Sequence, residues 1–134
     1  MVGILINTEM KRKIKFRAWH QARKEMRMNA ESAYDSDVDC FGDFIENDQY
    51  IVMQFTGITD ITGREVYEGD VINIGVLRSG YGRHEQVMIG ERLEVVFVDA
   101  WSAFGGTDGG AFFYFCDMRD IVVIGNIYEN PDIL

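Results

Sequence analysis

The sequence is poor in cysteine, histidine and proline, and it has no long hydrophobic run. Two cysteines, two histidines and one proline occur in 134 residues. Cys40 and Cys116 do not form a CxxC pair, so we expect two buried, reduced thiols, with a single disulfide or a metal ligand as the alternatives. His20 and His84 lack the spacing of a zinc site. No apolar run approaches the roughly 20 residues that span a bilayer, so the sequence predicts no membrane contact.

The first residues do not follow the order of a secretory signal. The apolar stretch MVGILIN is short and stands before its basic cluster, whereas a signal peptide begins with its basic residues. Met10 is an alternative start. We therefore interpret residues 1–134 as one domain whose residues 1–9 form a flexible N-terminal extension, since a chain of this length buries an ordinary core.

The net charge of −9 is unevenly distributed along the chain. Residues 11–28 hold eight of the thirteen basic residues, whereas residues 29–134 hold five basic and twenty acidic side chains. The basic residues interleave with Phe16 and Trp19, a pattern that favours phosphate contacts and base stacking. The candidate nucleic-acid contacts are Lys11, Arg12, Lys13, Lys15, Arg17, Arg23, Lys24 and Arg27. A solvated positive face that pairs with the acidic body of the protein is the alternative.

Alternating apolar residues predict an N-terminal β-hairpin. Ile14, Phe16 and Ala18 fall on one face of the first arm, and Met26 and Met28 are in phase on the second. A helix over residues 21–33 is the competing prediction, because Ala, Arg, Lys, Glu and Met favour helices. The acidic residues 35–49 are predicted to be a loop with at most one weak strand.

Glycine-marked turns divide the rest of the chain into short strands. A strand begins at Tyr50, a turn at Gly63 leads to REVY, and a second turn at Gly69 leads to the apolar strand VINIGVL. QVMIGERLEVVFV gives one or two strands with a bend at Gly90. AFFYFCDM and IVVIGNI are further strands, the second buried on both faces and ended before Pro131. In the tail, Tyr128 and Ile133 are expected to dock on the body.

Together these elements predict a mainly β fold. We expect a single domain, a small antiparallel and partly open barrel of five to seven strands with SH3-like character. At most one or two short helices are expected, near residues 21–33 or at the C-terminus.

The segment WSAFGGTDGG is predicted to be a mobile hairpin loop. It lacks the lysine of a phosphate-binding loop and the spacing of a dinucleotide fingerprint. Trp101 and Phe104 are candidates for a protein-binding surface, because exposed aromatic residues mark such surfaces. Ordinary core packing is the alternative.

One acidic segment has the spacing of a calcium-binding EF-hand loop. Cys40 occupies the position where that loop needs glycine, so a solvated acidic loop is the favoured interpretation. The residues with ligand spacing are Asp35, Asp37, Asp39, Asp43 and Glu46.

No catalytic residues are predicted. Ser32, Ser36, Ser79 and Ser102 stand in no nucleophile elbow. The spacing of the carboxylates Asp99, Asp117 and Asp120 does not argue for a two-metal nuclease site. We therefore expect no enzyme activity, no cofactor and no bound metal, with a metal-dependent nuclease as a remote alternative.

Three segments together resemble the YopX family of phage and prophage proteins. They are KIKFRAWH…KEM, MQFTGITDITGREVYEGDVI and VVIGNIYENPDIL, in the order of the family pattern and over a little more than a third of the chain. His20 stands where the family usually has an acidic residue. Residues 29–49 and 75–120 are variable in the family pattern and inherit nothing from it. The resemblance implies a β-rich, phage-encoded protein of the bacterial cytoplasm, but it carries over no catalytic residue.

The sequence therefore predicts a non-catalytic binding or assembly module. It would act through a protein partner or through self-association into a homo-oligomer, since an uncovered apolar strand such as IVVIGNI invites pairing. A nucleic-acid-binding accessory protein that uses the basic N-terminal segment is the alternative.

Overall fold

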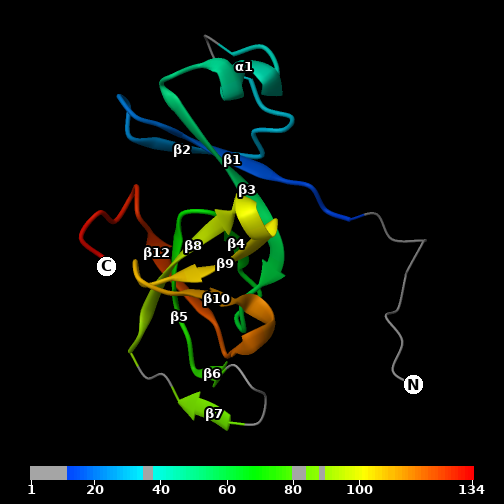
Figure 1. Cartoon of the computed structure of the whole chain (residues 1–134). Coiled ribbons are helices and arrows are strands. Elements are labelled where there is room, and N and C mark those ends of the chain that lie inside the picture. Colours follow the sequence, from blue (N-terminus) through cyan, green and yellow to red (C-terminus); the bar gives the residue numbers. More distant parts are fainter. Residues whose placement is uncertain (1–11, 35–37, 80–83, 88–89) are drawn as a thin grey trace.

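The computed structural model describes residues 12–34, 38–79, 84–87 and 90–134. Short strands dominate these residues, with one α-helix and two short 3-10 helices among them (Figure 1). The strands are β1 (Phe16–His20), β2 (Glu25–Met28), β3 (Tyr50–Thr59), β4 (Glu65–Tyr67), β5 (Asp70–Asn73), β6 (Val76–Ser79), β7 (His84–Val87), β8 (Arg92–Val98), β9 (Ala103–Thr107), β10 (Phe112–Tyr114), β11 (Met118–Arg119) and β12 (Val122–Asn126). The helices are α1 (Phe41–Glu46), η1 (Asp99–Trp101) and η2 (Phe115–Asp117).

The strands form three sheets, with the orders β2-β1-β3-β4, β10-β9-β8-β5-β12 and β11-β6-β7. Each pairing among the described residues is antiparallel. The long strand β3 runs from the upper lobe beside α1 down to the body, where the sheets curl into a partly open barrel (Figure 1). The predicted mainly β fold and partly open antiparallel barrel are therefore confirmed.

The strands are shorter and more numerous than the predicted five to seven. The run VINIGVL is divided at Ile74 and Gly75 into β5 and β6, which belong to different sheets. In AFFYFCDM the strand β10 ends at Tyr114, because Phe115 begins η2, and Met118 then begins β11. β12 is the last strand in the order of its sheet. Val123 is buried on one face and Ile124 is half-buried on the other, so the predicted burial on both faces holds for one face only.

The N-terminal hairpin is confirmed, and the competing helix over residues 21–33 is wrong. Trp19 pairs with Met26 in the hairpin, and on its other side Trp19 pairs with Ile51 of β3. The backbone N–H of Lys24 donates to the carbonyl of His20 and closes the turn. Pairing on both sides of β1 outweighs the helix propensity of the residues that follow it.

The loop predicted over residues 35–49 contains α1. This helix has no side-chain hydrogen bond at its N-cap, so local signals are weak. Phe44 is fully buried and packs edge-on against Tyr50 with ring centroids 4.9 Å apart. The helix thus completes a small second core with Ala18, Ala30, Val38 and Tyr50.

The main core fills the curled sheets and is built from alternating residues of several strands. Its members are Val66, Ile72, Ile74, Leu77, Leu93, Val95, Phe115, Met118, Ile121 and Val123. Both predicted turns around β4 are present, with positive φ angles of 90° at Gly63 and 85° at Gly69. Cys40 and Cys116 are free but exposed, so the expectation of buried thiols is wrong.

The C-terminal segment packs across the body, as the sequence predicted. The ring of Tyr128 stacks on Trp19 with centroids 5.9 Å apart, and it lies over Gly69. Ile133 packs over Gly125, and its carbonyl accepts a hydrogen bond of 2.6 Å from Nη1 of Arg92. The segment therefore connects the hairpin with the five-stranded sheet.

Candidate functional site

The candidate nucleic-acid contacts are divided between the interior and the surface. Lys11 lies outside the described residues, whereas Arg12, Lys13 and Lys24 are exposed. Lys15 forms an ion pair of 3.1 Å with Glu65.

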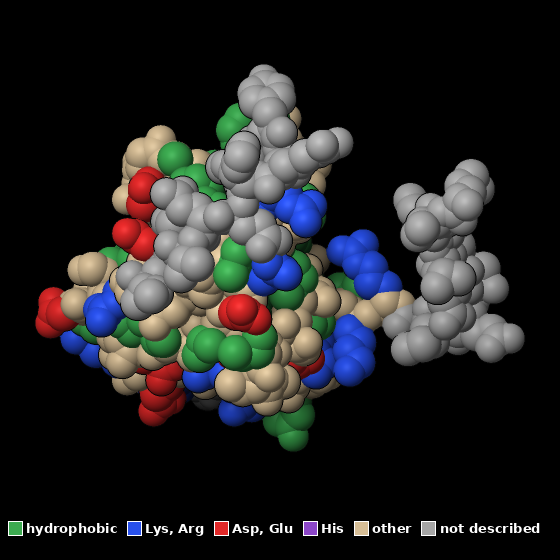
Figure 2. All heavy atoms as spheres, turned by 90° about the horizontal axis from the view of Figure 1, so that it is seen from below, with side chains coloured by type: hydrophobic (Ala, Val, Ile, Leu, Met, Phe, Trp, Pro, Cys, Tyr) green, Lys and Arg blue, Asp and Glu red, His purple; other side chains and the backbone are tan. Residues whose placement is uncertain are grey.

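Two further arginines in this set also bond within the protein. Nη2 of Arg23 donates to the hydroxyl of Tyr50 at 2.8 Å, and Nη2 of Arg27 donates to the carbonyl of Tyr34 at 2.7 Å. Seen from below, basic side chains gather where the chain continues into the N-terminal residues drawn in grey, and several acidic side chains lie on the opposite flank (Figure 2).

Arg17 is a core residue of this fold. Its side chain is 5% exposed and its Nη2 donates to Oδ1 of Asp70 at 2.8 Å and to the carbonyl of Glu68 at 3.0 Å. Its guanidinium lies 4.9 Å from the ring centroid of Tyr67. Burial raises the pKa of Asp70, and the charge of Arg17 opposes that rise. Arg17 thus joins the hairpin to the barrel and does not present its charge to a nucleic acid.

The segment predicted to be a mobile hairpin loop, residues 101–110, contains strand β9 of the five-stranded sheet, so the loop prediction is wrong for Ala103–Thr107. The register places Thr107 between Glu94 of β8 and Phe112 of β10. In the next row on the same face, Gly105 lies between Val96 and Tyr114. Directly opposed residues share one face of a sheet, so these two rows define what we call the outer face of β8–β10.

Aromatic rings cluster on this outer face. Trp101, Phe112 and Tyr114 form what we call the aromatic cluster, with ring centroids 5.3 Å apart for Trp101–Phe112 and 5.1 Å for Phe112–Tyr114. Trp101 is 57% exposed and Tyr114 is 41% exposed. The ring of Phe112 lies over Gly105, where a Cβ atom would be 2.5 Å from its Cζ. Glycine at this position therefore makes room for the cluster.

The two predicted protein-binding residues have different environments. Trp101 belongs to the exposed aromatic cluster. Phe104 is half-buried, packs against the main core and faces Phe97 with centroids 4.9 Å apart. The sequence did not identify Phe112 and Tyr114, which look like ordinary strand residues until the register brings them beside Trp101.

Carboxylates border the aromatic cluster. Glu94 shares the row of Phe112, and it lines a hollow of about 240 Å³ together with Glu68, Val96 and Tyr128. Burial raises the pKa of Glu94. Burial also raises the pKa of Glu68, to which the nearby charge of Asp99 adds. The charged residues that line this hollow are both acidic.

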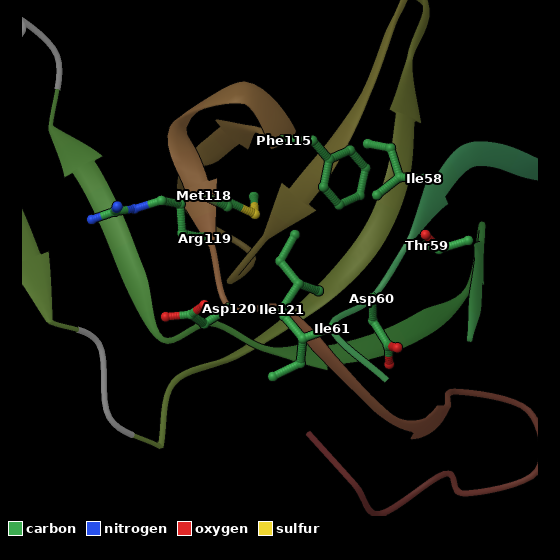
Figure 3. A pocket seen from close by; sticks show the side chains of 9 residues that line it. All are labelled: Ile58, Thr59, Asp60, Ile61, Phe115, Met118, Arg119, Asp120 and Ile121. Atoms are coloured by element: carbon green, nitrogen blue, oxygen red, sulfur yellow. The ribbon is translucent and has the colours of Figure 1, made fainter. Parts of the chain in front are cut away.

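A second hollow, of about 200 Å³, lies at the opposite end of the barrel between the β3–β4 turn and the η2–β11 segment. Ile58, Phe115, Met118 and Ile121 turn toward one another around it, and the side chain of Arg119 points away (Figure 3).

The carboxylate at the edge of this hollow is already fully engaged. Oδ1 of Asp60 accepts hydrogen bonds from the backbone and hydroxyl of Thr62 and from the N–H of Arg64, while Oδ2 accepts one from Val123. Burial alone would raise the pKa of Asp60, but these hydrogen bonds lower it to about 2. Asp60 therefore fixes a turn.

The acidic segment with EF-hand spacing lies partly outside the described residues, which exclude Asp35 and Asp37. Asp43 lies in α1, and its Oδ2 accepts a hydrogen bond from the backbone N–H of Asp39. In the part of the chain that the structure describes, no group of three or more His, Cys, Asp or Glu side chains is arranged to hold a metal ion.

None of the described helices has the length and hydrophobicity needed to cross a bilayer.

Comparison with known proteins identifies a family and a similar solved structure. The family model described as YopX protein matches residues 15–134. The crystal structure of protein EF1440 from Enterococcus faecalis is similar, with a TM-score of 0.60 and 26% sequence identity, covering 92% of this chain and 99% of that chain. None of the curated proteins compared with the chain matches it.

Proposed function

The chain belongs to the YopX family, and from that premise we propose that it is a non-catalytic binding module that docks a partner protein on the outer face of β8–β10. The observation that carries the proposal is the exposed aromatic cluster of Trp101, Phe112 and Tyr114. Trp and Tyr supply much of the binding energy of protein interfaces, and exposed apolar patches mark interaction sites.

The distribution of structural roles supports this proposal. Asp60, Gly63, Gly69 and Asp70, in the segment that resembles the family pattern, hold turns or the buried ion pair. The aromatic cluster lies instead within residues 75–120, outside the resembling segments. The residues that hold the framework are thus separate from those that form the exposed face, which is the arrangement expected of a binding module.

A capture experiment with matched variants tests the proposal. Wild-type protein and the double variant W101A/Y114A are crosslinked in lysogenic or infected host cells and purified with their partners. The control is Y34A/I45A, which removes two other exposed apolar side chains, 72% and 60% exposed. We expect a specific partner with the wild type and the control, and its loss with W101A/Y114A. Equal capture by all three proteins would overturn the proposed face.

A nucleic-acid-binding role is the second candidate, and the exposure of Arg12, Lys13 and Lys24 is what favours it. It is tested by salt-titrated binding to DNA and RNA with K13E/K24E, and with R78E as the control on another exposed residue. Arg17 is left unchanged, since reversing a buried charge would unfold the protein. We expect no difference between the variants.

The resemblance to phage and prophage proteins supports the further proposal that the module is encoded by a phage or prophage and works in the bacterial cytoplasm. Self-association is a second way in which the same face could be occupied, and the mass of the protein in solution distinguishes it from binding of a partner protein.

A screen for metal-dependent nuclease activity tests the proposed absence of catalysis. We expect no cleavage that depends on a carboxylate such as Asp99, Asp117 or Asp120.

A further inference from the structure

Strand β10 ends the five-stranded sheet and has an open side. β9 pairs with one side of β10 through Phe112–Thr107, Phe113–Gly106 and Tyr114–Gly105. Among the described residues no strand pairs with the other side. An edge strand presents backbone N–H and C=O groups along that side, and these groups can template a further strand.

The sequence of β10 lacks the residues that usually protect an edge. Its three residues, Phe112, Phe113 and Tyr114, include no charge and no proline. The edge strand β2 of the first sheet, by contrast, carries exposed Glu25 and Arg27. Charged side chains on an edge disfavour pairing with another chain. β10 is therefore open to strand addition in a way that β2 is not.

The side chains beside this edge would have to supply much of the affinity. A strand of three residues offers few backbone hydrogen bonds. Phe113 packs against the main core and fixes the strand, while Phe112 and Tyr114 project to the outer face beside Trp101. An added strand would lay alternate side chains across these rings.

The charges around the edge select the chemistry of that strand. Asp108 is exposed in the turn before β10 and Asp99 precedes Trp101 in η1, whereas Glu94 lies two strands away on β8. The nearby cation Arg92 donates a hydrogen bond to the carbonyl of Ile133. A lysine- or arginine-rich segment complements these carboxylates, and its cations can also lie over the exposed rings. A second copy, paired edge to edge, would bring like charges together.

Resting on the proposed function, we propose that an extended, basic segment of a partner protein adds to β10 as a further strand. Its backbone pairs with the open side of β10. Its apolar stems pack on the aromatic cluster, and its cations pair with Asp99 and Asp108. The exposed Trp101 provides an intrinsic fluorescence signal for this contact.

The test uses the full chain and a short synthetic peptide of alternating lysine and valine. We expect the peptide to change Trp101 fluorescence with saturation, and to bind more weakly as salt is raised. The glutamate–valine counterpart should not bind. N-methylation of every second peptide residue, at the positions whose backbone N–H points toward β10, should abolish binding. N-methylation of the residues between them should leave binding intact.

Protein variants locate the peptide. Y114K places a charge on the open edge, and it should weaken binding by about tenfold or more. D99N/D108N should weaken binding about threefold to tenfold, an effect that disappears at high salt. M28K is the matched control, because Met28 is 45% exposed on the edge strand β2, and it should leave the affinity unchanged.

Three results would overturn the inference. They are equal binding of the basic and acidic peptides, equal binding by Y114K and M28K, and a concentration-dependent dimer of the wild type that Y114K abolishes. The last result would assign the edge to a second copy. If no basic peptide binds but W101A/Y114A still loses its captured partner, strand addition fails while the proposed binding function stands.

Discussion

At the scale of single residues, two buried aspartates hold this fold together in different ways. Asp70 pairs with a charge from another sheet, whereas Asp60 accepts four hydrogen bonds from backbone and hydroxyl donors. Oδ2 of Asp70 also accepts a hydrogen bond from the backbone N–H of Tyr67, within the same turn. The burial of its partner Arg17 could not be predicted, because Arg17 stands in a run of basic residues, which is typical of a surface. Only the position of β1 between β2 and β3 shows that Arg17 is buried.

The Arg17–Asp70 pair gives the first prediction. Replacing Asp70 with alanine leaves a buried guanidinium without its partner, so the free energy of unfolding should fall by about 3–5 kcal/mol. Urea denaturation followed by circular dichroism measures the loss. K15M removes the partly exposed Lys15–Glu65 pair and should lower stability by less than about 1 kcal/mol. Equal losses in the two variants would contradict the assigned role of Arg17.

The lowered pKa of Asp60 predicts a stability change in acid. A carboxyl group whose pKa falls from 3.8 to about 2 on folding contributes stability above pH 3.8, and this contribution is lost as pH drops toward 2. The contribution is on the order of 2 kcal/mol. D60N should therefore be less stable than the wild type at pH 7, and the difference should shrink between pH 4 and pH 2. A difference that stays constant over this range would rule out the ionised hydrogen-bonded carboxylate.

At the scale of elements, the sequence predicted best where turn chemistry is local. Gly63 and Gly69 mark turns through their own backbone preference, and the hairpin follows from alternation. β9 was missed because Gly105 and Gly106 suggest a loop. In the fold they lie in a strand where the ring of Phe112 and the side chain of Leu93 occupy the space that a Cβ would need. This requirement comes from neighbouring strands and leaves no local signal.

The close packing over Gly105 gives a prediction for β9. A Cβ at this position would collide with the carbonyl oxygen of Phe113 and with the ring of Phe112. G105A should lose about 1–3 kcal/mol of stability and shift the fluorescence of Trp101, since overpacking displaces backbone and rings. In G110A the nearest atom, Oδ1 of Asp108, is 3.6 Å from the new Cβ, so stability should change by less than about 0.5 kcal/mol. Matching stabilities would refute the packing argument.

The C-terminal segment gives a prediction about local opening. Tyr128 is the contact between this segment and Trp19 of β1, with the rings 5.9 Å apart. Y128A should therefore increase amide hydrogen exchange in β1 and β2 more than in β8, because local stability follows local packing. Hydrogen-exchange mass spectrometry measures both regions in one sample. Uniform exchange changes would instead indicate a global loss of stability.

At the scale of the whole molecule, the barrel and its family could be predicted, whereas the binding face could not. Turn glycines and strand patterns are local, and they define the framework. The outer face of β8–β10 exists only because three strands align Glu94, Thr107 and Phe112 in one row and bring Tyr114 beside Trp101. Of the aromatic cluster, the sequence predicted only Trp101 as a candidate, together with the half-buried Phe104, because the surrounding glycines and polar residues suggested exposure.

Site-specific photocrosslinking in host cells tests the central claim most directly. A photoreactive amino acid is placed at position 114 on the outer face, or at position 45, where Ile45 is 60% exposed on α1. The account predicts a discrete crosslink to another polypeptide from position 114 and none from position 45. Crosslinks of the same pattern from both positions, or none from position 114 while the protein is captured in a complex, would contradict it.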